Sequence, residues 1–224
     1  MNNDAPKIAK QQGASPGKLV LVRHAESEWN ALGKWTGRTN VHLSDSGHEQ
    51  AQQLGKLLQD HTFHQAYHSE QIRTKQTLHG LLKGAGQEVP HQESHHLNER
   101  DYGDYTGLNK WEVQDQLGTG VFNQIRRSWD YPIPNGENLE MVYGRAVPFY
   151  LDTIVPQLLQ GKNVLVVSHG NTIRALMKYL ENISHEGIKD VEMPLGHALI
   201  YHVTPQGRAH SKEQRNIEIK ATKA

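Results

Sequence analysis

Two histidines follow two apolar runs of this sequence in nearly identical settings. Arg23 and His24 come directly after residues 19–22, Leu-Val-Leu-Val, and His169 comes one residue after 164–167, Val-Leu-Val-Val. Each run has the composition of a strand that is buried on both faces. In an open parallel sheet, ligands bind at the carboxyl ends of the strands. We therefore predict that the sheet places both imidazoles against one reacting group.

Residues 23–30, Arg-His-Ala-Glu-Ser-Glu-Trp-Asn, resemble the histidine phosphatase (phosphoglycerate mutase-like) superfamily. They are most similar to its cofactor-dependent phosphoglycerate mutases. Two further segments, 69–77 around Arg73 and 97–103 around Glu99, resemble family blocks in the same order. The resemblance covers residues from about 18 to about 203. It implies an α/β fold of three layers, α/β/α, with a mostly parallel central sheet.

The resemblance assigns the chemistry to particular positions. It makes His24 the nucleophile, since a neutral imidazole attacks phosphorus and the resulting phosphohistidine splits one hard displacement into two easier ones. The transferring phosphoryl group carries negative charge and needs fixed cations and N–H donors around it. Arg23, Arg73 and His169 meet that need. Three further donors are the side chain of Asn30 and the backbone of Gly170 and Asn171, which opens a helix.

Transfer to or from an alcohol also needs a proton donor for the leaving oxygen. Glu99 is the candidate, in a segment similar to the mutase block Leu-Asn-Glu-Arg-x-Tyr-Gly. A carboxyl group beside a crowded anion site is favoured in its protonated form by the neighbouring negative charge. Asp101 and Asp104 are nearby alternatives.

A mutase differs from a simple phosphatase because it must hold a second acidic group of the substrate. Arginine suits that task because it can clamp a carboxylate or phosphate with two hydrogen bonds. The residues that the resemblance assigns to it are Thr36, Gly37, Tyr102, Lys110, Arg126 and Arg127. Taken alone, Arg126 and Arg127 could equally form a solvated helix face.

The expected function is interconversion of 3-phosphoglycerate and 2-phosphoglycerate, through a phosphohistidine primed by 2,3-bisphosphoglycerate and without a metal. The substrate would thus be a small phosphorylated three-carbon acid. The alternative within the same superfamily is a broad-specificity phosphatase that transfers the phosphoryl group to water. A non-catalytic phosphate-binding module is the third possibility.

The composition excludes several other classes. Lysine plus arginine equals aspartate plus glutamate, 24 each, so nothing draws the chain toward nucleic acid or an anionic membrane. Any anion site must therefore be a local concentration of positive charge. The chain has no cysteine, hence no disulfide or thiolate metal site, and no apolar run of roughly 20 residues that would span a membrane. We expect a cytoplasmic homodimer or monomer.

Strands and helices alternate along the chain, which favours α/β architecture. The expected strands are 18–22, 65–68, 88–91, 163–167 and 198–203, the last of which closes the sheet. The expected helices are 44–59, 70–82, 139–159 with a bend at Pro148, and 172–181. Residues 97–136 read as an irregular insertion that forms a lid or wall. We expect one domain over 18–209, a disordered tail over 1–17 and a flexible tail over 210–224.

Three positions depart from the family pattern. Ala25 stands where glycine is usual, Ser168 where alanine is usual, and Arg38 where tryptophan is common. The link after Trp129 is also about 25 residues shorter than in the longer mutases, which leaves the oligomeric state open. Histidines at 61, 64, 68, 95 and 96 match no zinc spacing, and we expect them on the surface.

Overall fold

A six-stranded sheet runs through the centre of the protein in this computed structural model, which describes residues 15–219. The strands are β1 (Lys18–Arg23), β2 (Gln65–His68), β3 (His91–Glu93), β4 (Val164–Ser168), β5 (His197–Val203) and β6 (Ala209–Asn216). Their order across the sheet is β3-β2-β4-β1-β5-β6. The first four strands in that order are parallel, and β5 and β6 add two antiparallel pairings.

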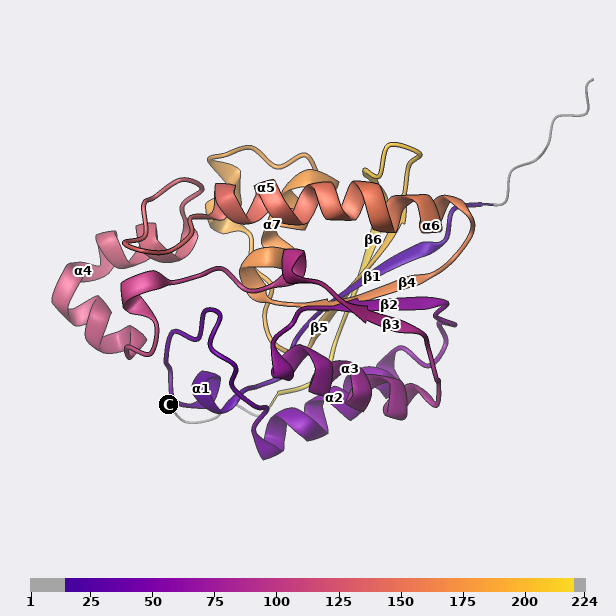
Figure 1. The fold of residues 1–224 in the computed structure, drawn as a ribbon, viewed down its shortest axis with the longest axis horizontal. Helices are drawn as coiled ribbons and strands as arrows, with labels where there is room; N and C mark the ends of the chain where they lie inside the picture. Colours follow the sequence, from indigo (N-terminus) through magenta and orange to yellow (C-terminus); the bar gives the residue numbers. More distant parts are fainter. Residues whose placement is uncertain (1–14, 220–224) are drawn as a thin grey trace, which may run out of the picture.

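Helices cover both faces of this sheet, with α2 and α3 on one side and α5, α6 and α7 on the other (Figure 1). The α-helices are α1 (Glu28–Ala31), α2 (Asp45–Leu57), α3 (Ile72–Ala85), α4 (Lys110–Arg127), α5 (Leu139–Phe149), α6 (Val155–Leu159) and α7 (Gly170–Leu180). Single turns of 3-10 helix are η1 (His95–Leu97), η2 (Gly103–Tyr105) and η4 (Gly187–Asp190). The expected three-layer α/β/α fold is confirmed.

Alternate residues of the central strands supply the two halves of the core. Leu19 and Leu21 of β1 pack with α5, α6 and α7, whereas Val20 and Val22 pack with α2 and α3. A strand covered on both faces needs apolar side chains at every position. This is why the runs in β1 and β4 could be recognised from sequence. None of the helices in residues 15–219 is long and apolar enough to cross a bilayer.

The helix boundaries follow local signals in the sequence. Ser44 caps α2 by accepting a hydrogen bond from the backbone N–H of Gly47 at 3.0 Å, as expected. Gly86 ends α3 in the left-handed conformation, with φ of 67°. The helix expected over 139–159 is present as α5, a π-helical segment (Tyr150–Ile154) and α6. Pro148 lies in the last turn of α5, directly before the π-helical segment, and has no N–H to donate within the helix.

Two predictions about the segments flanking the site were wrong. Residues 97–136 contain the 18-residue helix α4, capped by Asn109 and interrupted at Gly118, where φ is 78°. Glycines at 118 and 120 hid this helix from the sequence pattern. A small core of its own, Trp35, Val113, Phe122, Ile125 and Ile133, holds α4 in place. It lies beyond one end of the sheet, outside both helical layers (Figure 1).

The second error concerns the C-terminal part of the chain. Residues from 210 were expected to form a flexible tail and β5 to close the sheet, but β6 extends the sheet by one more antiparallel strand. Arg215 ties β6 to the α2 region through the carboxylate of Asp60, at 2.6 and 2.8 Å, and the carbonyl of Leu57, at 2.9 Å. The structured domain thus extends past residue 209. The expected N-terminal tail falls on residues 1–17, of which 1–14 lie outside the described part of the chain.

Close contact between α2 and α3 depends on glycine. A Cβ atom on Gly55 would lie 2.0 Å from the carbonyl oxygen of Leu81, so the helices would have to separate. Gly55→Ala should therefore lower the free energy of unfolding by about 1–3 kcal/mol. Gly144→Ala on α5 is the matched control, since no atom lies within 4 Å of its added methyl group. That variant should gain roughly 0.5–1 kcal/mol. Urea denaturation measures both, and equal stability of the two variants would contradict this packing.

Candidate active site

Parallel pairing of β1 with β4 brings the two histidines together. The register sets Arg23 opposite Ser168, and the backbone N–H of His24 donates to the carbonyl of Ser168 at 2.8 Å. The next residues, His24 and His169, therefore leave the sheet at the same level. Their ring centroids are 5.0 Å apart with an interplanar angle of 59°. The predicted juxtaposition of the two imidazoles is present.

The hydrogen bonding of His24 leaves one nitrogen ready to attack. Its Nδ1 lies 2.7 Å from the carbonyl oxygen of Ala25. A carbonyl only accepts, so Nδ1 carries the proton and Nε2 carries the lone pair. Burial lowers the pKa of His24 well below its usual value, and the charges of Arg73 and Arg23 lower it further. The ring is thus neutral, as a nucleophile must be.

Two arginines, the buried Arg73 and the half-buried Arg23, flank the rings with donors to spare. Arg73 donates to the carbonyls of Thr39 and Gly37, each at 2.8 Å, and Arg23 donates to that of Met193 at 2.9 Å. The Nε–H of both arginines is buried and has no hydrogen-bond partner within residues 15–219. An unpaired buried donor is costly, and an anion would satisfy both. Burial lowers the pKa of Arg73 to about 10, so it stays charged at neutral pH.

The segment that carries Glu99 is held at three consecutive carbonyls by two buried side chains and one half-buried side chain. Ser168 Oγ donates to Leu97 at 2.8 Å, and Thr172 Oγ1 donates to Asn98 at 2.6 Å. The third bond runs from the guanidinium of Arg145 to the carbonyl of Glu99 at 3.1 Å. This explains the serine at position 168, since alanine could not make the first bond. The glutamate is thereby fixed beside the arginines.

The two alternative proton donors, Asp101 and Asp104, form hydrogen bonds outside the two histidine cavities. Asp101 accepts from the backbone N–H of Gly103 at 2.9 Å, and Asp104 accepts from the side chain of Asn135 at 3.0 Å. Neither lines the cavities at the two histidines, whereas Glu99 lines both. Glu99 is therefore the better placed of the three carboxylates.

Two adjoining cavities open at this end of the sheet. The inner cavity, about 40 Å³, reaches His24 and is lined by Arg23, His24, Asn30, Lys34, Trp35, Thr36, Gly37, Arg73, Glu99, Tyr102 and Lys110. The outer cavity, about 130 Å³, shares five of these and adds Arg126, Arg127, Gly170, Asn171, Arg174, Glu192, Met193 and Pro194. Every residue expected at the site lines one of the two except His169, which lies fully buried against His24.

The two cavities concentrate positive charge in a protein whose net charge is zero. Together they are lined by seven lysines and arginines and by two glutamates. Lys110 lies between the cavities, and its pKa is lowered to about 8 by burial and by the charges of Arg23 and Arg126. An anion with more than one charge would relieve this repulsion. A larger hollow of about 730 Å³ lies beside Trp129 and His185 and contains neither site histidine.

Helix α7 points its N-terminus into the outer cavity. His169 is its N-cap residue, and Gly170 and Asn171 form its first turn, where unpaired N–H groups favour anions. The amide of Asn171 donates to the hydroxyl of Tyr102 at 2.8 Å. This bond joins the two predicted binding residues across the wall of the cavity.

Ser69 is a site residue that the sequence analysis missed. Its Oγ lies 2.7 Å from Nε2 of His169 and 2.8 Å from Oγ1 of Thr74, all of them buried. These contacts fix the orientation of the second imidazole. The signal was available, because Ser69 follows β2 directly just as the two histidines follow β1 and β4.

Arg174 is a second missed residue, and no sequence signal marks it. Its guanidinium donates to the carbonyls of Arg126 and Arg127 at the end of α4, at 3.3 and 3.1 Å. It also donates to the carbonyls of Ile188 at 2.7 Å and Val191 at 2.8 Å. Arg174 thereby fastens the end of α4 and the loop after η4 to α7. This holds Arg126 and Arg127 at the outer cavity.

Not every predicted cation is free of acidic partners. Arg127 forms an ion pair with Glu192, a contact absent from the sequence-based prediction. Arg126 stacks over the ring of Phe122, 5.2 Å from its centroid. Arg38, one of the departures from the family pattern, pairs with Glu137 at 2.8 Å outside both cavities. Its charge is therefore not part of the site.

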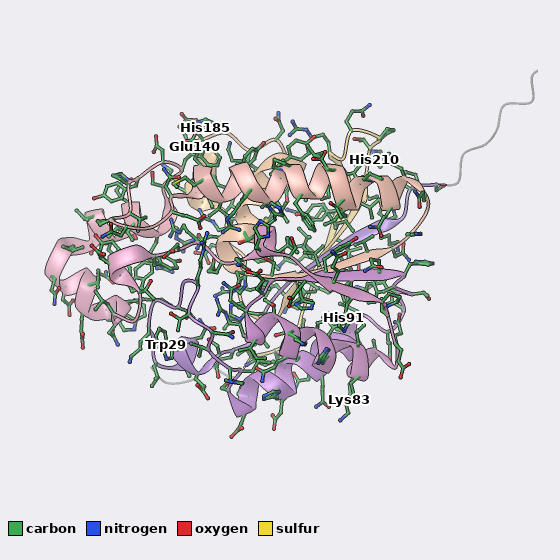
Figure 2. The ribbon with its side chains drawn as sticks, in the orientation of Figure 1. Trp29, Lys83, His91, Glu140, His185 and His210 are labelled. Atoms are coloured by element: carbon green, nitrogen blue, oxygen red, sulfur yellow. The ribbon has the colours of Figure 1, made fainter. Side chains whose placement is uncertain are left out.

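The prediction that the extra histidines lie on the surface was partly wrong. His61 and His68 are buried, whereas His64 is exposed and accepts from the backbone N–H of Asn163 at 3.0 Å. His91 packs against His68 and His79, with ring centroids 5.5 and 5.4 Å apart, and lies on the opposite side of the molecule from His185 (Figure 2). Within residues 15–219, no group of three or more histidine or carboxylate side chains is arranged to hold a metal ion.

Comparisons with known proteins agree with this geometry. The family model of the histidine phosphatase superfamily (branch 1) matches residues 19–217. A 2,3-bisphosphoglycerate-dependent phosphoglycerate mutase 2 of Latilactobacillus sakei is 39% identical over 227 residues, covering 89% of this chain and 99% of that protein. Bacillus stearothermophilus YhfR has a TM-score of 0.76 at 26% identity, covering 87% and 94% of the two chains. The alpha-ribazole phosphatase from Shigella flexneri shares the fold, with a TM-score of 0.72 at 24% identity, covering 91% and 100%.

The contact between Ser69 and His169 can be tested by binding. Ser69→Ala removes the partner of His169 Nε2, so the imidazole loses its fixed orientation. The dissociation constant for inorganic phosphate should rise about five- to tenfold, because losing one hydrogen bond costs about 1–1.5 kcal/mol. Calorimetry measures the affinity, and ¹⁵N chemical shifts report the protonation of the His169 ring. Ser46→Ala, on the exposed face of α2, is the matched control. Unchanged affinity and ring shifts in Ser69→Ala would contradict this role.

Proposed function

Because this chain belongs to the histidine phosphatase superfamily, branch 1, we propose that it interconverts 3-phosphoglycerate and 2-phosphoglycerate through a phosphohistidine at His24. The observation that carries the proposal is the pairing of the two cavities. The inner one suits a transferring phosphoryl group, and the outer one adds cations at a distance from the nucleophile. Curated relatives about 40% identical are named as phosphoglycerate mutases.

In this proposal the inner cavity performs the phosphoryl transfer. Nε2 of His24 attacks phosphorus in line with the leaving oxygen, and Arg23 and Arg73 neutralise the charge on the equatorial oxygens. Burial and the charge of Arg73 lower the pKa of His169 well below its usual value, so its neutral ring contributes a hydrogen bond and no charge. Glu99 gives its proton to the leaving alkoxide and takes one back when a substrate hydroxyl attacks the phosphohistidine. His24, once loaded, gives its phosphoryl group to the free hydroxyl of 3-phosphoglycerate and then takes back the phosphoryl group from position 3. 2-Phosphoglycerate leaves and His24 is again phosphorylated, so the net reaction is an isomerisation.

The same residues fit the expected primer. 2,3-Bisphosphoglycerate, when bound, would supply the phosphoryl group that loads His24. The unpaired Nε–H groups of Arg23 and Arg73 and the excess of cations suit such a polyanion. Lys110, Arg126 and the α7 N-terminus would hold its groups that do not react. The proposed chemistry assigns no role to a metal ion, a nucleic acid or a membrane.

A broad phosphatase is the second candidate, and one observation favours it. Glu192 neutralises Arg127 in the outer cavity, which weakens the case for a strong second anion site. Hydrolysis needs only the inner cavity, because water replaces the substrate hydroxyl as acceptor. The two candidates differ in whether the outer cavity is used during turnover.

An enolase-coupled assay tests the proposed function. The protein should convert 3-phosphoglycerate when 2,3-bisphosphoglycerate is present, and acid-labile phosphate should accumulate on the protein. His24→Ala should abolish both signals, since within residues 15–219 no second histidine lines the inner cavity. Absence of mutase turnover together with rapid phosphate release from many monoesters would favour the phosphatase instead.

A double variant separates the two cavities. Arg126→Ala with Arg127→Ala removes two charge-assisted contacts to the non-reacting end of the substrate, each worth about 1.5–3 kcal/mol. Mutase turnover should fall by about two or more orders of magnitude. Hydrolysis of a small monoester without a carboxylate should fall far less. Equal loss of both activities in a folded protein would mean that these arginines serve the transferring phosphoryl group.

A further inference from the structure

We propose that Glu192 is a specificity-determining residue whose carboxylate occupies Arg127 while the site is empty and competes there with the acidic end of the ligand. The inference rests on the proposed function, in which the outer cavity receives a second acidic group. Glu192 would therefore lower the affinity for multiply charged ligands without touching the transferring phosphoryl group.

The position of Glu192 supports this role. It lines the outer cavity with Arg126 and Arg127 and pairs with the Nη2 of Arg127. Its side chain is 57% exposed, whereas that of Arg127 is 25% exposed. Within residues 15–219, the carboxylate makes no other hydrogen bond. Glu192 can thus swing into solvent when a ligand takes its place.

The backbone around Glu192 is fixed even though the side chain is not. The carbonyl before it, on Val191, accepts from Nε of Arg174 at 2.8 Å, and the carbonyl after it, on Met193, accepts from Arg23 at 2.9 Å. Two cations of the site therefore hold this loop from both sides. They keep the carboxylate of Glu192 at the mouth of the outer cavity.

The charge of Glu192 is felt by more than its direct partner. Burial lowers the pKa of Arg23 and that of Arg126, and in both cases Glu192 opposes the shift. The carboxylate thus lies within the field of three guanidinium groups. In the empty protein it stands in for part of the negative charge that a ligand would bring.

An exposed ion pair of this kind is weak, about 0–1 kcal/mol. A ligand already anchored by its phosphoryl group in the inner cavity can therefore displace it. A ligand carboxylate and the Glu192 carboxylate cannot share Arg127 without repulsion. The penalty should grow with the number of acidic groups that reach the outer cavity. It should be smallest for inorganic phosphate, larger for 3-phosphoglycerate and largest for 2,3-bisphosphoglycerate.

Glu192→Gln removes the charge and keeps the shape of the side chain. Calorimetric titration of the whole protein with these three ligands, with every protein compared also carrying His24→Ala so that no phosphoryl transfer occurs, should show tighter binding in the variant. The dissociation constant for 2,3-bisphosphoglycerate should fall about three- to fivefold, with smaller decreases for the other two. Glu186→Gln is the matched control, since Glu186 is an exposed glutamate of the same region outside both cavities. Its three dissociation constants should stay within about twofold of wild type.

Two results would overturn the inference. Weaker binding in Glu192→Gln would mean that the carboxylate positions Arg127 for the ligand instead of competing with it. An equal change for all three ligands, or an equal effect of Glu186→Gln, would mean that only the overall charge matters. Because binding is measured without turnover, a graded effect in a protein that lacks mutase activity would refute the proposed function alone.

Discussion

The parallel pairing of β1 with β4 is the constraint on which the site depends. Its register brings His24 and His169 to the same level at the carboxyl edge of the sheet. A slip of one residue would turn the apolar side chains of β1 toward the wrong helical layer, because alternate residues serve the two halves of the core. Core packing therefore sets the level at which the two histidines leave the sheet, and the contacts of Ser69 with His169 and of Ala25 with His24 orient their rings. The hydrogen bonds between β1 and β4 therefore stabilise the sheet and also position the two histidines.

This protein has no net charge, yet it concentrates lysine and arginine side chains around the two cavities. Acidic partners would neutralise the site, so several of its arginines instead bind backbone carbonyls, whose dipoles solvate a guanidinium without cancelling its charge. Arg73 does this with Thr39 and Gly37, and Arg174 does it with four carbonyls of two distant segments. The guanidinium groups are thereby oriented while their field stays available to a ligand. Arg127 is the exception, because it pairs with the carboxylate of Glu192. Glu192 is also the most exposed acidic group in the outer cavity.

The parts of this structure that could be predicted are those coded locally. Continuous apolar runs marked β1 and β4, and linear motifs marked His24 and Glu99. The strand β6 was missed because nearly all its side chains are exposed at the sheet edge, so its sequence shows no alternation. Arg174 and Glu192 gain their roles only through contacts with distant segments, which no spacing in the sequence reveals. Ser69 could have been predicted in part. Its position directly after a strand can be read from the sequence, but its contact with His169 cannot.

The order of strands in the sheet also matters while the protein is being made. Among residues 15–219, β1 precedes every other strand in the sequence, whereas its neighbours β4 and β5 both begin more than 140 residues after β1 begins. At about 5–20 residues per second, the nascent chain carries β1 unpaired for roughly 7–30 s. The segment Leu19–Val22 is apolar and β-prone, and such segments aggregate when exposed. The strand that precedes His24 is thus covered only after the two strands that flank it in the sheet have been made, and until then it carries an aggregation hazard.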